Sequence, residues 1–205
     1  DRCLIASGGH TSLFHVGEDG RPHELGRSRD DAAGEAFDKV ARLLGLPFPG
    51  GPALARLAED GDADAWRLPT PLRNQAGYDF SFSGLKTAVA VLLEREPDAD
   101  PADVAAAFER TVVGSLVGTV ARAARDTGLR TVVAAGGVAA NRRLRAALAA
   151  SGLDVRIPPP ELATDNGAMI ALAARARLAE GTPPPDWTRD ASPYLPLDTA
   201  ARASS

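Results

Sequence analysis

Two glycine turns and one aspartate are the residues of this chain best suited to chemistry. Residues 7–11 (SGGHT) stand between two apolar runs, and residues 164–170 (TDNGAMI) open a helical pattern. Glycine lets the backbone approach a ligand closely, and N–H groups at strand ends or helix starts bind anions. Asp165, which we expect to be buried, adds a carboxylate that suits a metal ion or a phosphate site. The pairs Gly50-Gly51 and Gly136-Gly137 repeat this pattern, so the sequence predicts a ligand cleft.

Two polar side chains near these turns could contact a ligand directly. Asp38 lies inside a predicted helix, on the face shared with Asp31 and Glu35, where it could reach a ligand hydroxyl. Asn141 follows the second glycine pair by one helical turn, a place from which a side-chain amide can hold a nucleoside or phosphate. Ordinary helix starts with turn glycines explain these residues equally well, so both interpretations stay open.

Basic residues give a weaker signal for nucleic-acid binding. Arg142, Arg143 and Arg145 could form a patch for an RNA backbone, although a solvated helix face is the stronger interpretation. Lys86 could contact an anion, but the glycine-rich lead-in of a Walker A loop is absent before it. Because the formal net charge is −4, any RNA contact must come from a local patch.

Composition is typical of a soluble globular protein that forms one large domain or two small lobes. The chain has 205 residues, of which 44% are hydrophobic and 24% are charged. No apolar run approaches the ~18 residues of a membrane span, so we expect no membrane contact. The single cysteine, Cys3, allows no internal disulfide and fits a reducing cytoplasm. His10 is either a surface histidine or a substrate contact. The chain runs from Asp1 directly into a strand, so we expect a portion of the full protein to precede it.

The elements that position these residues alternate between strands and helices. Apolar alternation predicts a hairpin over residues 2–16 and a third strand near 23–26. A continuous apolar run over 131–135 predicts a strand buried on both faces, and a further strand is expected over 154–157. The predicted helices cover 30–45 (capped by Ser28), 52–60, 83–95 (capped by Ser83), 101–126, 140–151 and 166–180. We therefore expect an α/β fold in which helices cover a mixed sheet.

Six segments, in this order, closely resemble the bacterial tRNA adenosine threonylcarbamoyltransferase family. They are residues 7–11 (SGGHT), 30–39 (DDAAGEAFDK), 49–52 (PGGP), 80–87 (FSFSGLKT), 135–141 (AGGVAAN) and 164–170 (TDNGAMI). The resemblance implies an actin-like ATPase (ribonuclease H-like) fold, with residues 1–181 as its C-terminal lobe and 182–205 as a proline-rich polar tail. It also implies an acyltransferase that modifies tRNA. The enzyme would move a threonylcarbamoyl group from its adenylate to the exocyclic amine of the adenosine 3′ of the anticodon, in tRNAs that read A-starting codons.

The resemblance further implies site residues, a metal and partners. Contacts to the adenylate would come from Ile5, Ala6, Ser7, Gly8, Gly9, Asp38, Gly51 and Asn141. Asp165 would be one ligand of a divalent metal, Fe²⁺ in this family. The His-x-x-x-His pair that completes the family's metal site does not occur in this sequence. The expected partners are tRNA, an inactive paralogue and the pathway ATPase, all in the cytoplasm.

The catalytic residues stay unassigned, and we expect the chain alone to have little or no transferase activity because one carboxylate cannot hold iron tightly. Two other functions stay open from the sequence. One is a nucleotide-dependent kinase or carbamoyltransferase of the same superfold. The other is a non-catalytic lobe that serves in nucleotide binding or assembly.

Overall fold

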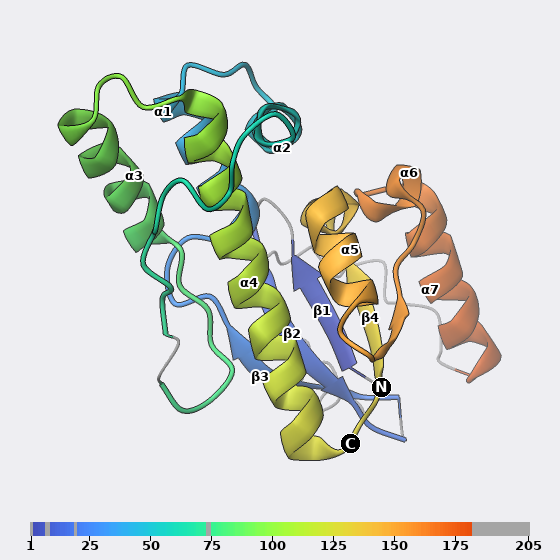
Figure 1. Ribbon diagram of the computed structural model, residues 1–205. Coiled ribbons are helices and arrows are strands. Elements are labelled where there is room, and N and C mark those ends of the chain that lie inside the picture. The colour runs from blue at the N-terminus through green and yellow to red at the C-terminus, as the bar shows by residue number, and fades with distance from the viewer. Residues whose placement is uncertain (1, 7–8, 19, 73–74, 182–205) are drawn as a thin grey trace.

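The computed structural model describes residues 2–6, 9–18, 20–72 and 75–181 (Figure 1). Its strands are β1 (Arg2–Ala6), β2 (Thr11–Val16), β3 (Pro22–Arg27), β4 (Thr131–Ala135) and β5 (Asp154–Arg156). They form one sheet in the order β3-β2-β1-β4-β5. The first three strands are antiparallel neighbours, whereas β4 runs parallel to β1 and β5 runs parallel to β4. The predicted mixed sheet is therefore confirmed.

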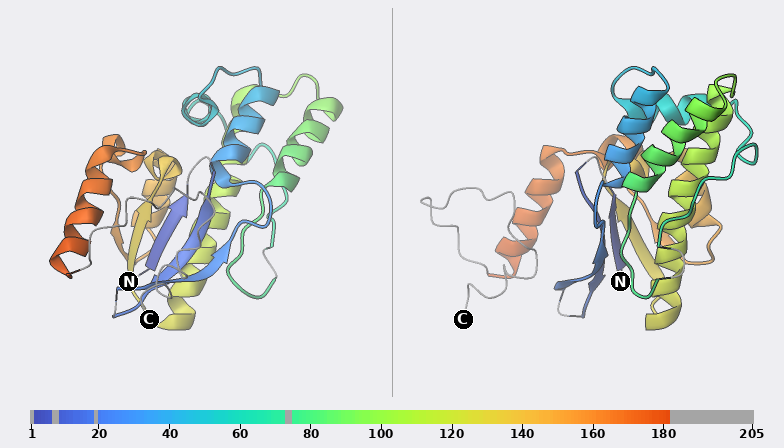
Figure 2. Two further views of the ribbon diagram at one scale, coloured as in Figure 1. Left: turned by 180° about the vertical axis from the view of Figure 1, so that it is seen from behind. Right: turned by 90° about the vertical axis from the view of Figure 1, so that its left-hand side faces the viewer.

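Helices surround this sheet. They are α1 (Ala33–Leu43), α2 (Gly50–Ala58), α3 (Ser83–Arg95), α4 (Pro101–Thr127), the 3₁₀ helix η1 (Gly137–Ala140), α5 (Arg142–Ala149), α6 (Pro160–Ala163) and α7 (Gly167–Ala179). Figure 2 shows α4 and α7 on opposite sides of the sheet, with α1 and α2 beyond its end.

The carboxyl ends of β1 and β4 meet at one edge of the sheet. Ile5 lies opposite Ala135 in the parallel register, so the two strands end side by side. The Thr11 hydroxyl accepts a 2.8 Å hydrogen bond from the Ala33 backbone N–H, which ties the start of α1 to the same edge. Open sheets of this kind bind ligands outside the carboxyl ends of their parallel strands.

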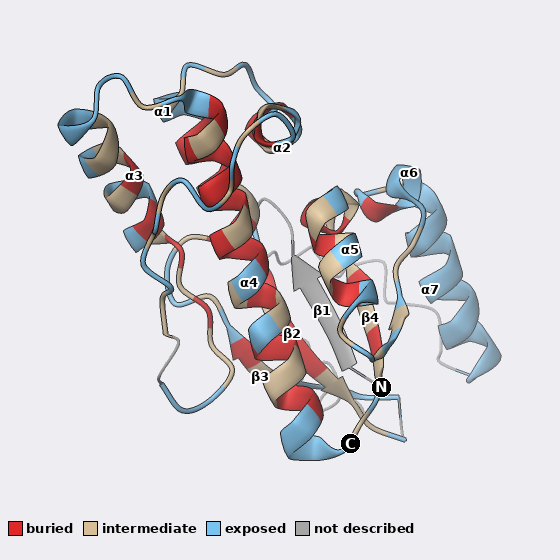
Figure 3. Cartoon of the chain, viewed as in Figure 1, coloured by how far each residue is buried: buried red, intermediate tan, exposed pale blue. Residues whose placement is uncertain are grey.

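The long helix α4 forms the centre of the core (Figure 3). Its apolar stripe is buried at Val104, Phe108, Val112, Leu116 and Val120, whereas Val117 is half-buried. By length and composition α4 could cross a membrane, so the prediction that no apolar run approaches that length is wrong. However, 72% of its most apolar 18-residue window is buried inside the protein. This burial is typical of a core helix.

Two predicted helix caps are wrong. The Ser28 hydroxyl donates to the Asp31 carbonyl at 2.6 Å, and α1 starts only at Ala33. Ser83 lies inside the first turn of α3, where Asp30 accepts hydrogen bonds from the N–H groups of Phe82 (2.8 Å) and Ser83 (3.2 Å). The acceptor at this helix start is thus a carboxylate more than fifty residues earlier in the chain, which local patterning does not reveal.

Three other boundaries and burial patterns differ from the predictions. The helix expected over 140–151 is α5, which starts only at Arg142 because Asn141 adopts an extended conformation and caps it; the 3₁₀ helix η1 precedes Asn141. The second helix starts at Gly50 rather than residue 52. Strand β4 is fully buried on one face only, at Val132 and Ala134, with the other face half-buried. Residues 182–205, the predicted tail, lie outside the described residues.

Helix α7 exposes its apolar side chains. It has no buried residue, and Met169, Ile170, Leu172 and Leu178 are 46–65% exposed (Figure 3). The described part of the chain therefore leaves this helix without an apolar cover.

Candidate functional site

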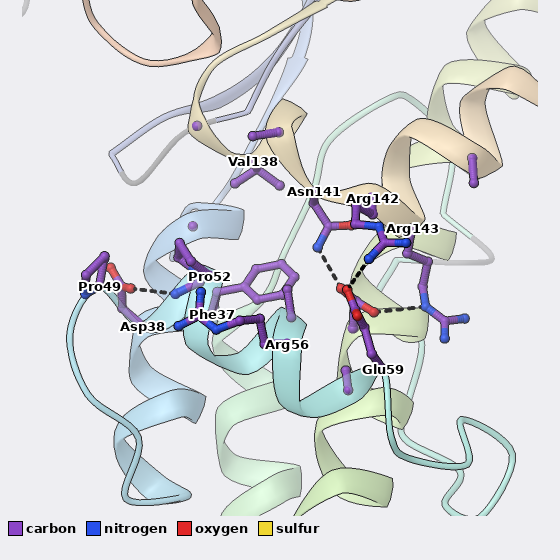
Figure 4. A pocket seen from close by; sticks show the side chains of 18 of the residues that line it. Phe37, Asp38, Pro49, Pro52, Arg56, Glu59, Val138, Asn141, Arg142 and Arg143 are labelled. Atoms are coloured by element: carbon purple, nitrogen blue, oxygen red, sulfur yellow. Dashed lines mark hydrogen bonds and ion pairs between the residues drawn. The ribbon is translucent and has the colours of Figure 1, made fainter. Parts of the chain in front are cut away.

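A pocket of about 1160 Å³ opens beside the turn that follows β4. Helices α1 and α2 form one side of it, and η1, α5 and one residue of α4 form the other (Figure 4). Phe37 and Val138 contribute apolar surface, whereas Asp38 and Asn141 contribute polar groups from the two sides. Phe37 packs edge-to-face on Phe108, with ring centroids 5.2 Å apart, so this wall is fixed by the core. An apolar pocket with a few placed polar groups is typical of a small-molecule site.

Asp38 links the two helices on its side of the pocket. Its Oδ1 accepts hydrogen bonds from the N–H groups of Gly50 (2.9 Å) and Gly51 (3.2 Å), which explains why α2 starts at Gly50. The second oxygen, Oδ2, has no hydrogen-bond partner within the described ranges. Asp38 is half-buried and lines the pocket, so Oδ2 is available to a ligand donor such as a hydroxyl group.

The glycines of the Gly50-Gly51 pair have different roles. A Cβ added to Gly50 would lie 2.7 Å from the Ala41 Cβ and 2.8 Å from the Asp38 Cα, so the packing of α1 on α2 requires glycine there. A Cβ added to Gly51 would meet only the Phe37 Cβ, at 3.9 Å, and the fold leaves that space open. Both N–H groups of this pair donate to Asp38.

On the other side of the pocket, Asn141 belongs to a hydrogen-bonded network. Its Oδ1 accepts from the Leu144 N–H at 2.9 Å, which caps α5, and its Nδ2 donates to Glu109 Oε1 at 2.6 Å. Glu109 Oε2 in turn accepts from Arg143 Nε at 2.9 Å. Glu109 is only 5% exposed, so this network brings a buried carboxylate to the pocket wall.

The charges around the pocket are mostly paired. Arg142 contacts Glu59 at 2.7 Å, and Arg143 contacts Glu109. Arg56, which also lines the pocket, forms no ion pair with any residue that the structure describes. A cation in that state is the natural partner for an anionic group of a ligand.

Three of the predicted contact residues meet in this pocket. Asp38, Gly51 and Asn141 line it, although they are far apart in the sequence. Ile5 and Ala6 end β1 at the neighbouring sheet edge, and their predicted contacts stay predictions. Gly9 is exposed and does not line the pocket. Ser7 and Gly8 lie outside the described residues, so their predicted contacts stay predictions.

Asp165 differs from its prediction in burial. It is exposed rather than buried, and it does not line the pocket, although the adjacent Thr164 does. The Thr164 Cγ2 lies 4.0 Å from where a Cβ of Gly137 would be, so this segment sits beside the second glycine pair. No group of three or more His, Cys, Asp or Glu side chains that could hold a metal occurs among the described residues. These residues therefore do not fit a complete metal site.

The basic residues considered for RNA binding are largely engaged within the protein. Arg142 and Arg143 pair with glutamates, and the Arg145 guanidinium donates to the Pro158 carbonyl at 2.6 Å. Lys86 is exposed on α3, and His10 is exposed after β1; neither lines the pocket.

Sequence reasoning missed Arg56 and Glu109. Pro52, Arg56 and Glu59 line the pocket at successive spacings of four and three residues. This helical periodicity places the three residues on one face of the helix and could have identified Arg56 from the sequence. Glu109 gave a weaker signal, namely one acidic residue directly after the core residue Phe108. Its partners come from a different helix, so the sequence offers no local indication of them.

Sequence comparison relates the chain to one enzyme family. The sequence model of the tRNA N6-adenosine threonylcarbamoyltransferase family matches residues 2–172. A protein of that name from Thermus thermophilus is 53% identical, over 97% of this chain and 60% of the relative. A protein of the same name from Verminephrobacter eiseniae is also 53% identical, with the same coverage of both chains. The chain thus spans about 60% of the length of these curated relatives.

Comparison with solved structures identifies the fold. Full-length HypF in its phosphate- and nucleotide-bound form has a TM-score of 0.65 at 16% identity, over 89% of this chain and 40% of HypF. The activator of the 2-hydroxyisocaproyl-CoA dehydratase from Clostridium difficile, with bound ADPNP, has a TM-score of 0.53 at 16% identity, over 90% of this chain and 64% of the activator. Both neighbours have the actin-like ATPase fold, which confirms the predicted fold class.

Proposed function

The chain belongs to the tRNA N6-adenosine threonylcarbamoyltransferase family, and we propose that its full-length protein transfers threonylcarbamoyl from an adenylate to a tRNA adenosine. The observation that supports this most is the meeting of Asp38, Gly51 and Asn141 in one pocket. Each of them matches a segment of the family pattern, and together they offer the groups that a nucleotide needs. The proposal concerns the full-length protein, since this chain spans 60% of its relatives.

The pocket suits the adenylate part of the donor. The free Oδ2 of Asp38 can accept from a ribose hydroxyl, and the apolar surface of Phe37 and Val138 can pack on a purine. Arg56 can offset the charge of the phosphate. The open space at Gly51 allows the ligand to approach the backbone of α2. We propose that Ile5, Ala6, Ser7, Gly8 and Gly9 add backbone contacts from the turn after β1.

The proposed reaction is an acyl transfer. The exocyclic amine of the adenosine attacks the carbamoyl carbon, a C–N bond forms, the bond to the phosphate oxygen breaks, and AMP leaves as the amine loses a proton. The amine is a weak nucleophile, so holding the two reactants in line supplies much of the acceleration. The pocket residues therefore act by binding and orienting the donor, and we assign no catalytic residue.

We propose that Asp165 contributes one ligand to a divalent metal, Fe²⁺, in the full-length protein. Its exposed carboxylate leaves it accessible to such an ion. The remaining ligands would come from outside the described residues. A metal there would supply Lewis-acid polarisation of the carbamoyl oxygen.

The family resemblance also supports a place among partner proteins. We propose that tRNA docks near the pocket opening, and that an inactive paralogue and an ATPase of the same pathway assemble with the enzyme in the cytoplasm. The paired arginines of α5 offer few free cations to RNA, so the docking charges must lie elsewhere on the full-length protein.

An assay of the full-length protein with threonylcarbamoyl-adenylate and tRNA tests the proposal. Nucleoside analysis by mass spectrometry should detect N6-threonylcarbamoyladenosine. Asp38→Asn keeps an acceptor for the α2 start but replaces Oδ2 with an amide, so the KM for the adenylate should rise about tenfold, equivalent to ~1.4 kcal/mol. Asp31→Asn is the matched control, because Asp31 pairs with Lys39 at 2.7 Å and does not line the pocket.

Two results would reject this function. The first is the absence of modified adenosine when the full-length protein, its partners and both substrates are present. The second is phosphoryl transfer from ATP to a small-molecule acceptor without tRNA modification, which would support the kinase alternative instead.

A further inference from the structure

We propose that Glu109 is a positioning residue that fixes the Asn141 side chain in the orientation that binds the adenylate. This inference rests on the proposed function and adds a residue that none of the sequence motifs assigns. It starts from an unusual placement: Glu109 lies in the middle of the core helix α4, yet it lines the pocket.

Burial makes Glu109 costly unless its oxygens are satisfied. The residue is 5% exposed, and a buried carboxylate without partners destabilises a protein strongly. Both oxygens are satisfied, Oε1 by Asn141 Nδ2 at 2.6 Å and Oε2 by Arg143 Nε at 2.9 Å. The short distance to Nδ2 is typical of a charge-assisted hydrogen bond. Both oxygens of Glu109 thus act as acceptors in this arrangement.

This network leaves only one orientation for the Asn141 amide. Oδ1 faces the Leu144 N–H and Nδ2 faces Glu109. Rotating the amide by half a turn would place Oδ1 against the Glu109 carboxylate and Nδ2 against an N–H donor, so both hydrogen bonds would be lost. Nδ2 keeps a second hydrogen, which is available to a ligand in the pocket that Asn141 lines. Glu109 therefore determines that Asn141 presents a donor.

Kinetics of the full-length enzyme can separate this role from a purely structural one. Glu109→Gln keeps the shape of the side chain, but its amide can no longer accept from both Asn141 and Arg143. We expect the KM for threonylcarbamoyl-adenylate to rise about tenfold with kcat changed less than twofold. In an Asn141→Ala background, which already lacks the amide, the same substitution should change KM less than twofold.

Two further variants make the comparison secure. Glu109→Asp keeps the charge on a shorter side chain, so its KM should fall between those of the wild type and Glu109→Gln. If Glu109→Gln does not fold, Glu109→Asp replaces it in the comparison with and without Asn141→Ala. Asp30→Asn is the stability control, since Asp30 caps α3 and does not line the pocket. It should lower the melting temperature without changing KM.

The outcomes are distinct. An equal rise in KM from Glu109→Gln with and without Asn141, or an effect on kcat alone, would overturn the positioning role and leave the proposed function intact. Wild-type protein that modifies no tRNA would overturn both. A rise in KM that disappears in the Asn141→Ala background would establish that Glu109 acts through Asn141.

Discussion

Asp30 and Asp38 are eight positions apart, and each stabilises the start of a helix further along the chain. Asp38 accepts from Gly50 and Gly51 at the start of α2, and Asp30 accepts from Phe82 and Ser83 at the start of α3. Only Asp38 lines the pocket. One acidic segment thus orders two helices and leaves a single carboxylate oxygen, Oδ2 of Asp38, for a ligand.

The Asp30 carboxylate predicts a pH-dependent stability. Burial raises its pKa, but hydrogen bonds from Ser81, Phe82 and Ser83 outweigh that effect and hold the pKa below its ordinary value of 3.8. Since the folded-state pKa is the lower one, the stabilisation is present above about pH 3.8 and is lost as the pH falls further. Asp30→Asn keeps an acceptor for the two N–H groups but replaces Oδ2, to which the Ser81 and Ser83 hydroxyls donate. It should therefore lower the free energy of unfolding by about 1 kcal/mol at neutral pH, the usual net value of a hydrogen bond.

Urea unfolding between pH 7 and pH 3 measures this effect. The stability difference between Asp30→Asn and the wild type should shrink at the acidic end of the range. A difference that stays constant across the range, or that grows towards low pH, would show that Asp30 is not ionised in the cap.

At this scale, the sequence predicted residues whose role is local. Asn141 could be found because it follows a glycine pair at a helix start, and Asp38 because it stands in a recognisable segment. Glu109 could not be found, because its partners Asn141 and Arg143 lie on another helix and follow it by more than thirty residues. The burial of Asp165 was predicted wrongly because the local sequence, an acidic residue beside a glycine turn, does not reveal whether another segment of the chain packs over it.

At the scale of elements, the approach of α1 to α2 determines the shape of the pocket. Gly50 allows this approach, since any side chain there would overlap Ala41 and the backbone of Asp38. Gly50→Ala should therefore force the two helices apart and destabilise the protein by about 2 kcal/mol, as overpacking in a core does. Thermal or urea unfolding measures the loss.

The neighbouring substitution is the control for this prediction. Gly51→Ala meets only the Phe37 Cβ at 3.9 Å and should leave the free energy of unfolding within about 0.5 kcal/mol of the wild type. Equal stability of the two variants would contradict the packing of α1 on α2 described above.

Periodicity predicted the elements better than their ends. Alternation predicted β2, and the helix predicted over 101–126 matches α4 within one residue at its end. The starts of α1 and α2 were misplaced because their first N–H groups donate to distant side chains, Thr11 and Asp38. The helix expected over 140–151 starts at Arg142 for a local reason, since Asn141 is extended and caps α5.

At the scale of the whole molecule, the parallel strands β1 and β4 end at one sheet edge, and helices from both halves of the chain line one pocket beside it. The order of the six segments predicted this convergence, because the family that they resemble has this fold. The apolar side chains of α7 remain exposed in the described part of the chain. That the 205-residue chain alone lacks transferase activity remains a prediction.

The central claim is that the pocket between α2 and η1 binds the adenylate. Isothermal titration of the full-length protein with an unreactive analogue of threonylcarbamoyl-adenylate tests it most directly. Gly51→Ala adds one methyl group to the pocket, whereas Gly84→Ala makes the same change at the same position of α3, where a Cβ meets nothing within 4 Å. We predict that Gly51→Ala weakens binding at least tenfold and that Gly84→Ala leaves it unchanged. Wild-type affinity in the Gly51→Ala protein would contradict the account.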